Sequence, residues 1–287
     1  MRAGSLVVTL FGDTISQHGN SVWLGSVIRV LEPLGLNQRL VRTAVYRLMQ
    51  DDWLFSEQIG RKSYYSLTAS GLRRYQKAAQ RIYAADHGLD GGDWLFVYLN
   101  ELAEKQRELL RKELRWLGFG NLFPGVMAKP GVERVPLDET LVELGVQEQV
   151  VVMRCQPDDG LSAEQLCQRV FDCWNLEQLQ QQYREFLVQF APLHKRFNKG
   201  DGLDQEASFQ LRTLLIHEYR RLLLKDAELP QELLPADWEA KEVHDMTADL
   251  YRQIQENAMA FAITSMETAN GCLPDAEADY FSRFGGL

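Results

Sequence analysis

Hydrophobic side chains recur at helical spacing along the first fifty residues of the chain. Residues 5–17 form the first such stretch, and its apolar stripe consists of Leu6, Val7, Leu10, Phe11 and Ile15. Ser21 is placed to cap a second helix, which Pro33 ends, and Asn37 is placed to cap a third helix that runs to about residue 50. The pattern therefore predicts three consecutive helices.

The third predicted helix has two faces of opposite character. Its apolar face consists of Leu40, Val41, Ala44, Val45 and Leu48. Its first turn and its opposite face carry Gln38, Arg39, Arg42, Thr43 and Tyr46. Cations in a first helical turn oppose the helix dipole, so they make sense if an anion approaches there. Because these side-chain types also hold phosphates or read base edges, we predict that this face enters the major groove of DNA.

A basic hairpin and a fourth helix follow. Residues 53–59 and 64–67 have strand character, the turn between them carries Arg61 and Lys62, and Thr68 begins a helix. Three helices, a basic hairpin and a further helix predict a winged helix-turn-helix, whose hairpin touches the flanking DNA backbone. A solvated surface explains any one of these elements equally well, so the prediction depends on their order.

The middle of the chain alternates between strand and helix patterns. After a joint at Gly91-Gly92, strands are predicted at residues 93–99 and 149–155, with one or two more at 119–128. Helices are predicted at residues 103–117 and 137–144. This order predicts a ferredoxin-like sandwich. Its first strand runs into Asn100-Glu101 without a clustered acidic partner, so we predict neither a metal site nor a nuclease.

The remainder of the chain has a helical pattern. The predicted helices are residues 163–171, 176–197, 209–225 and 237–268, with breaks at Pro192, Gly200–Gly202, Pro230 and Pro235. The predicted fold class is therefore α+β and multi-domain. The predicted domains are a winged-helix domain at 1–90, a ferredoxin-like domain at 91–159, and a helical effector and dimerisation domain at 160–287, with the second boundary near residues 158–160.

The charge distribution changes the picture that the total charge gives. The 287 residues carry a formal net charge of -9, which by itself argues against binding to nucleic acid. Residues 1–87, however, hold 11 Lys and Arg against 6 Asp and Glu, a net of +5, and the rest of the chain is at -14. A random difference in charge between domains is the alternative. The unequal distribution of charge nevertheless fits a basic N-terminal domain that binds an anion, joined to an acidic remainder.

The sequence also points to a compartment. We find no run of about 20 apolar residues long enough to span a bilayer and no cleavage-site pattern of a signal peptide. The four cysteines form no C-x-x-C pair, which fits a reducing environment. We therefore expect a cytoplasmic protein that does not bind membranes.

Several long stretches resemble one family, the PaaX repressors of phenylacetate catabolism. They are FGDTISQHGN at 11–20, VWLGS at 22–26, RLVRT at 39–43, GRKSYY at 60–65, LIHEYRR at 215–221, LPQELLPADW at 229–238 and YFSRFGG at 280–286. The resemblance implies a homodimeric repressor with a GntR-like winged helix, released from palindromic operator DNA by phenylacetyl-CoA. It also implies a middle domain similar to small CRISPR-associated nucleases. One departure is Glu239-Ala240, where the family usually has Pro-Gly or Ala-Gly.

The effector, phenylacetyl-CoA or a related aryl-CoA, needs cations for its phosphates and aromatic side chains for its aryl group. His217, Tyr219, Arg220 and Arg221 lie within about one and a half helical turns, and Trp238 follows a loop bounded by prolines. We predict these five residues as ligand-binding. The alternative is a core helix whose arginines pair with Glu218 or Asp226. Trp116 and the turn at 118–120 form a second candidate region.

We weigh a repressor against two other classes of protein. An enzyme of the same pathway, such as a CoA-thioester hydrolase, is not supported, because the chain lacks G-x-S-x-G, H-E-x-x-H, Walker and G-x-G-x-x-G motifs. We therefore predict no catalytic residues, no metal and no cofactor. An adaptor whose basic head binds an acidic protein is the third option, and a sequence-specific DNA footprint separates it from a repressor.

Overall fold

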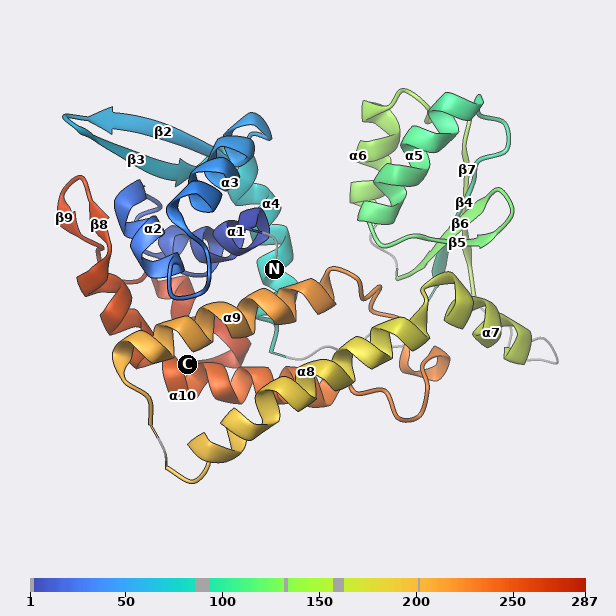
Figure 1. The fold of residues 1–287 in the computed structure, drawn as a ribbon. Coiled ribbons are helices and arrows are strands. Elements are labelled where there is room, and N and C mark those ends of the chain that lie inside the picture. The colour runs from blue at the N-terminus through green and yellow to red at the C-terminus, as the bar shows by residue number, and fades with distance from the viewer. Residues whose placement is uncertain (1–2, 86–92, 132–133, 157–162, 201) are drawn as a thin grey trace. The chain divides into compact units, whose positions relative to one another are not determined.

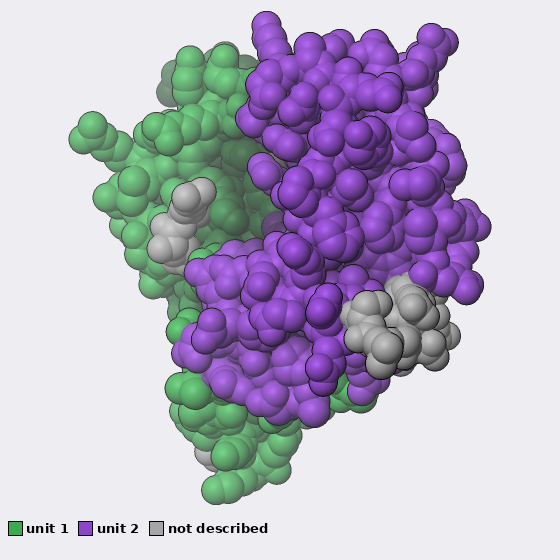
Figure 2. Space-filling view, turned by 90° about the vertical axis from the view of Figure 1, so that its right-hand side faces the viewer, with its two compact units in different colours: residues 1–86, 185–223, 241–287 green, residues 87–184, 224–240 purple. Residues whose placement is uncertain are grey.

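The computed structural model describes residues 3–85, 93–131, 134–156, 163–200 and 202–287, and it has the predicted α+β class (Figure 1). The predicted joint at Gly91-Gly92 and the boundary near 158–160 lie outside these described residues. Two compact units are distinguished by colour in Figure 2. Unit 1 comprises Met1–Asp86, Glu185–Leu223 and Lys241–Leu287, and unit 2 comprises His87–Arg184 and Leu224–Ala240. The three-domain boundaries stay a prediction, since these units divide the chain differently.

The head of unit 1 follows the predicted order of elements. In chain order they are α1 (Ala3–Asp13), η1 (Ile15–Gln17), β1 (Val22–Trp23), α2 (Leu24–Leu31), α3 (Gln38–Gln50), β2 (Leu54–Ile59), β3 (Lys62–Leu67) and α4 (Ala69–Ile82). The strands form an antiparallel sheet in the order β1-β3-β2, and β2 and β3 make the wing (Figure 1). Gly60 turns the wing with a φ of 62°, a conformation that glycine adopts without strain.

The predicted cap at Asn37 and the predicted helix start at Thr68 are confirmed, and Thr68 is also a cap. The Asn37 side chain accepts a hydrogen bond from the backbone N–H of Leu40 at 3.0 Å, and Thr68 Oγ1 accepts one from Gly71 at 2.8 Å. Both residues thereby satisfy donors that the first turn of a helix leaves without an intrahelical partner.

Two details of the head were predicted wrongly. Ser21 does not cap the second helix, because Val22–Trp23 forms a short strand that pairs with β3 and Trp23 takes the cap position. Leu40 does not belong to the apolar face of α3, since 45% of it is exposed. The buried residues of α3 are Val41, Ala44, Val45 and Leu48.

The C-terminal part of unit 1 packs directly against the head. Its elements are the later part of α8 (Leu176–Phe197), α9 (Gln205–Leu223), α10 (Ala240–Ser265), β8 (Glu267–Thr268), β9 (Gly271–Cys272) and η3 (Ala278–Gly285). The α9 helix contacts α1 and α4 and buries residues on most sides. Figure 1 shows the β8–β9 hairpin beside the head, where β8 contacts β1.

Two features of this part depart from the all-helical pattern. The β8–β9 hairpin was not predicted, because strands of two residues leave no alternating signal. The predicted break at Pro192 is wrong, since α8 continues through it. Proline removes the hydrogen bond to the carbonyl four residues earlier, which is that of Val188. Val188 is 77% exposed, so water can satisfy this carbonyl.

Unit 2 contains the predicted ferredoxin-like sandwich. Its elements are β4 (Trp94–Tyr98), α5 (Glu104–Trp116), β5 (Gly120–Phe123), β6 (Val126–Pro130), α6 (Val135–Glu143), β7 (Val151–Cys155), α7 (Ala163–Cys173), the first part of α8, and η2 (Gln231–Leu233). The antiparallel sheet has the order β5-β6-β4-β7, which is that of a split β-α-β fold. One sheet face packs on α5 and α6, and residues of α7 and of the 227–238 segment cover the other.

Candidate nucleic-acid interface and ligand residues

The polar face of α3 is open to solvent. We call its members the α3 surface, and they are Gln38, Arg39, Arg42, Thr43 and Tyr46. All five are exposed, Tyr46 to 64%, because the buried residues of the helix hold its opposite side against the head. The α3 helix contains no acidic residue, so its field is positive. The sequence-predicted DNA-binding side chains of this helix are therefore brought together on one accessible face.

Contacts within the α3 surface hold some of its side chains in place. Thr43 Oγ1 donates to the carbonyl of Arg39 at 2.9 Å, which leaves the hydroxyl free to accept. With its amide oxygen directed toward Arg42, Gln38 accepts from the Nε and Nη2 of that guanidinium at 3.1 and 3.0 Å. The remaining donors of Arg42 can pair with the N7 and O6 acceptors of a guanine.

The two predicted DNA-binding residues of the wing have different surroundings. Arg61 is exposed at the turn. Lys62 is half-buried, with its Nζ 4.5 Å from the centroid of the Trp23 ring and in an ion pair with Glu267 of β8. Among the described residues, Lys62 of the wing therefore has an anionic partner and Arg61 has none.

The predicted ligand residues His217 and Arg220 face α1 of the head. His217 Nδ1 lies 3.2 Å from Thr9 Oγ1, and Arg220 Nη1 donates to Thr9 Oγ1 at 3.3 Å and to the Ser5 carbonyl at 3.4 Å. Burial, with Arg220 and Arg221 nearby, lowers the pKa of His217 to about 4. These two side chains therefore join α9 to α1, with a neutral imidazole at neutral pH.

The other predicted ligand residues lie in separate surroundings. Tyr219 is buried with its hydroxyl 2.9 Å from His244 Nδ1, whereas Arg221 is half-exposed and pairs with Glu218 at 2.5 Å. Trp238 belongs to unit 2 and packs edge-on against Tyr183 there. The five residues are thus not gathered around one cavity within unit 1, and their assignment to a ligand stays a prediction.

The second candidate region is in unit 2. The Trp116 side chain lies outside the described part of the structure. In the turn at 118–120, Trp174 Nε1 donates to the Gly118 carbonyl at 3.4 Å. A Cβ placed on Gly120 would lie 2.5 Å from Cys173 Sγ, so this turn is closely packed.

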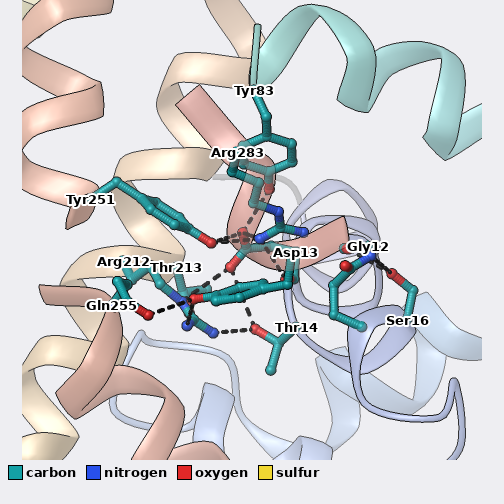
Figure 3. Close-up of polar contacts among 12 residues, drawn as sticks. Gly12, Asp13, Thr14, Ser16, Tyr83, Arg212, Thr213, Tyr251, Gln255 and Arg283 are labelled. Carbon is teal, nitrogen blue, oxygen red and sulfur yellow. Dashed lines mark hydrogen bonds and ion pairs between the residues drawn. The ribbon is translucent and has the colours of Figure 1, made fainter. Parts of the chain in front are cut away.

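A buried polar network centred on Asp13 was missed by the sequence analysis (Figure 3). Asp13 ends α1, and its carboxylate pairs with Arg212 of α9 at 3.2 Å and with Arg283 of η3 at 2.9 Å. Tyr83 and Tyr251 donate their hydroxyls to its Oδ1 at 2.6 and 3.1 Å. All five side chains belong to unit 1 and are buried, so the network fastens the head to the C-terminal helices from inside.

The charges of this network are stable against titration. Burial alone would raise the pKa of Asp13, but Arg212, Arg283 and the two tyrosine hydroxyls outweigh it and hold that pKa below its usual value. Burial likewise raises the pKa of Tyr83 and of Tyr251. The sequence does hold one signal, since Asp13 is a carboxylate at the end of an apolar helix and a buried carboxylate needs cationic partners.

Two further properties concern the described residues as a whole. They contain no group of His, Cys, Asp and Glu side chains arranged to hold a metal ion. None of their helices combines the length and the apolar character required to cross a membrane.

Comparisons with known proteins cover nearly the whole chain. Residues 2–71 match the family model of the PaaX-like protein, residues 89–167 that of the PaaX protein central Cas2-like domain, and residues 174–264 that of the PaaX-like protein C-terminal domain. The Transcriptional repressor PaaX of Escherichia coli (strain K12) is 39% identical over 284 residues, which are 99% of this chain and 90% of the relative.

One solved structure is also similar. It is the uncharacterized protein Rv0674 from Mycobacterium tuberculosis, with a TM-score of 0.47 and 19% identity. The match covers 81% of this chain and 90% of that chain.

Proposed function

The chain belongs to the PaaX family of transcriptional repressors, and from this premise we propose that it binds palindromic operator DNA as a homodimer and is released by phenylacetyl-CoA. The family evidence is for a repressor and not for an enzyme. Because a repressor acts on operator DNA, the proposal includes the cytoplasmic location that the sequence predicts.

The exposed α3 surface is the observation that carries the proposal. Arg39 and Arg42 project from one side of a helix without acidic residues, with Thr43 and Tyr46 between and beside them. A helix of this width fits the major groove, where arginine pairs with guanine and other polar groups hold phosphates. Arg61 at the wing turn is placed to contact backbone beside that groove. Two heads related by a twofold axis read the two halves of a palindrome.

We further propose that the effector approaches α9 at Arg221, the half-exposed member of the predicted ligand residues. Its guanidinium would bind a phosphate of the CoA moiety in place of Glu218. His217 and Arg220 connect the same helix to α1, and α1 packs against α3. A shift of α9 is therefore carried to the α3 surface through direct contacts. An aromatic contact between Trp238 and the acyl group stays a prediction.

The test uses a duplex that the full-length protein selects from a random-sequence library. We expect a gel shift of this duplex by the purified protein, and loss of the shift on addition of phenylacetyl-CoA. Free CoA and free phenylacetate serve as controls and should leave the shift in place. A shift indifferent to the thioester would refute effector release, and failure to select any sequence would refute operator binding. Steady hydrolysis of the thioester, measured as released thiol, would instead favour the pathway enzyme.

A further inference from the structure

The two neighbouring cations of the wing differ in what surrounds them. No described residue accepts a hydrogen bond from Arg61 or forms an ion pair with it, and its side chain is exposed. Lys62 retains 40% side-chain exposure, but its ammonium is bound by the Glu267 carboxylate and lies over the Trp23 ring. One of the two charges that the wing can offer to a DNA phosphate is therefore already occupied by an oxyanion of the same chain.

The backbone around Glu267 is held independently of Lys62. The N–H of Glu267 donates to Ser26 Oγ at 3.1 Å, and Arg29 donates to the Ser265 carbonyl. Glu267 also pairs with Cys272 across the β8–β9 hairpin. These contacts fasten the chain to α2 at Glu267 and two residues before it, and the hairpin pairing holds Glu267 from the other strand. Its carboxylate would therefore stay beside the wing if Lys62 left it.

The wing, in turn, is held without Glu267. The β3 strand pairs with β1 through Val22 and Trp23 and with β2 along its length. The ammonium group of Lys62 also lies over the Trp23 ring, which belongs to β1. Both side chains of the ion pair are partly exposed, and such pairs add little to stability. Its main consequence is therefore electrostatic, since it neutralises a wing cation.

We propose that Glu267 competes with DNA phosphate for Lys62 and acts as an autoinhibitory contact on the wing. A carboxylate and a phosphate oxygen make the same charge-assisted hydrogen bond to an ammonium group. The wing then contacts the DNA backbone through Arg61, while Lys62 remains with Glu267. This inference rests on the proposed function, because it concerns the strength of DNA binding by the same head.

The experiment measures DNA affinity by fluorescence anisotropy over a series of salt concentrations. Two probes are used, the selected duplex and a random duplex of equal length. We expect Glu267→Gln to tighten binding to both, because Lys62 becomes free to bind a phosphate. Release of one further counterion should steepen the slope of log K against log salt by about 0.9 and tighten binding up to about eightfold at ~0.1 M salt.

A double-mutant cycle identifies Lys62 as the origin of the gain. Lys62→Ala should hardly change the affinity of the wild-type protein but should abolish the gain in the Glu267→Gln background. Arg61→Ala should weaken binding and lower the slope by about 1 in either background. Asp275→Asn is the matched control, because it removes one exposed carboxylate from the same segment without touching the wing.

The outcomes separate this inference from the proposed function. Unchanged or weaker DNA binding by Glu267→Gln, at unchanged thermal stability, would overturn the autoinhibitory contact and make Glu267 a support of the wing. An equal gain from Asp275→Asn would overturn it too, because the effect would then be one of net charge. Failure of the wild-type protein to bind either duplex would refute the proposed function itself.

Discussion

Two helices of unit 1 carry arginines at helical spacing, yet α3 presents its arginines to solvent and α9 keeps Arg212 and Arg220 inside. The α3 helix has one apolar stripe, so its other faces need no partner from the protein. The α9 helix is covered on most sides, so its cations take Asp13, Ser5 and Thr9 as partners. Arginines at helical spacing therefore indicate a binding surface only when no other part of the protein packs on the face that carries them.

The largest expected effect comes from removing the carboxylate that Arg212 binds. Asp13→Ala leaves two buried guanidinium groups without their counter-ion, and loss of one partner of a buried pair costs about 3–5 kcal/mol. Urea unfolding followed by circular dichroism measures this loss. Asp275→Ala, an exposed carboxylate, is the control and should stay near the wild type. A loss below about 1 kcal/mol for Asp13→Ala would contradict a structural role for the cation on α9.

The pH dependence of stability tests whether His217 is buried as a neutral group. Its folded-state pKa of about 4 is below the unfolded value, so the unfolded state binds more protons between these two values. Stability is then complete above about pH 6.5 and falls as the pH approaches about 4, by up to ~1.4 kcal/mol per unit. His217→Asn keeps an acceptor or donor for Thr9 and should flatten this part of the curve. An identical slope in both proteins would place His217 in contact with solvent.

For the exposed arginines of α3, we expect Arg42→Ala to weaken DNA binding without changing the stability of the fold. If Arg42 pairs with a guanine, the selected duplex binds about 1–3 kcal/mol more weakly and discrimination at that base pair relaxes. Titration of the selected duplex and of single-base variants measures both quantities. Arg73→Ala removes an equally exposed arginine from α4 of the same head and serves as control. Equal losses from the two variants would indicate a general charge effect in place of base reading.

The smallest expected effect concerns Arg221, which is half-exposed, whereas the other two arginines of α9 are buried. Its ion pair with Glu218 is half-exposed, so Arg221→Ala should alter the free energy of unfolding by less than about 0.5 kcal/mol. The phenylacetyl-CoA concentration that releases half of the DNA should rise about fivefold, as expected for the loss of about 1 kcal/mol. Lys241→Ala removes another exposed cation that pairs within its own helix and is the matched control. An unchanged release concentration would contradict the proposed approach of the effector at Arg221.

Local signals in the sequence were sufficient for most of the fold. The cap at Asn37 and the helix start at Thr68 depend on neighbouring residues only, and both were predicted correctly. Leu40 was misplaced because ideal helical spacing does not reveal which edge of an apolar stripe the core reaches. The α3 surface was predicted residue by residue, since its arginines depend on no distant partner.

The polar contacts inside unit 1 could not be predicted from local sequence patterns. Asp13 and Arg283 are 270 positions apart, and no periodicity connects them. The roles of His217 and Arg220 likewise depend on Ser5 and Thr9, which lie more than 200 positions away. The ion pair of Lys62 with Glu267 was hidden for the same reason, because β8 has no recognisable pattern of its own.

The ion pair between Asp13 and Arg283 also affects when, during synthesis, a new chain becomes able to bind DNA. A ribosome produces the head early, but one of the two guanidinium groups that neutralise Asp13, that of Arg283, emerges only near the end of η3. Contacts between such distant positions form late in folding, because a long loop must close first. A nascent chain therefore carries an incompletely locked head, and products truncated before Arg283 should be recognised by proteases instead of occupying DNA. We therefore expect DNA binding to be strongest in chains that have been translated through η3.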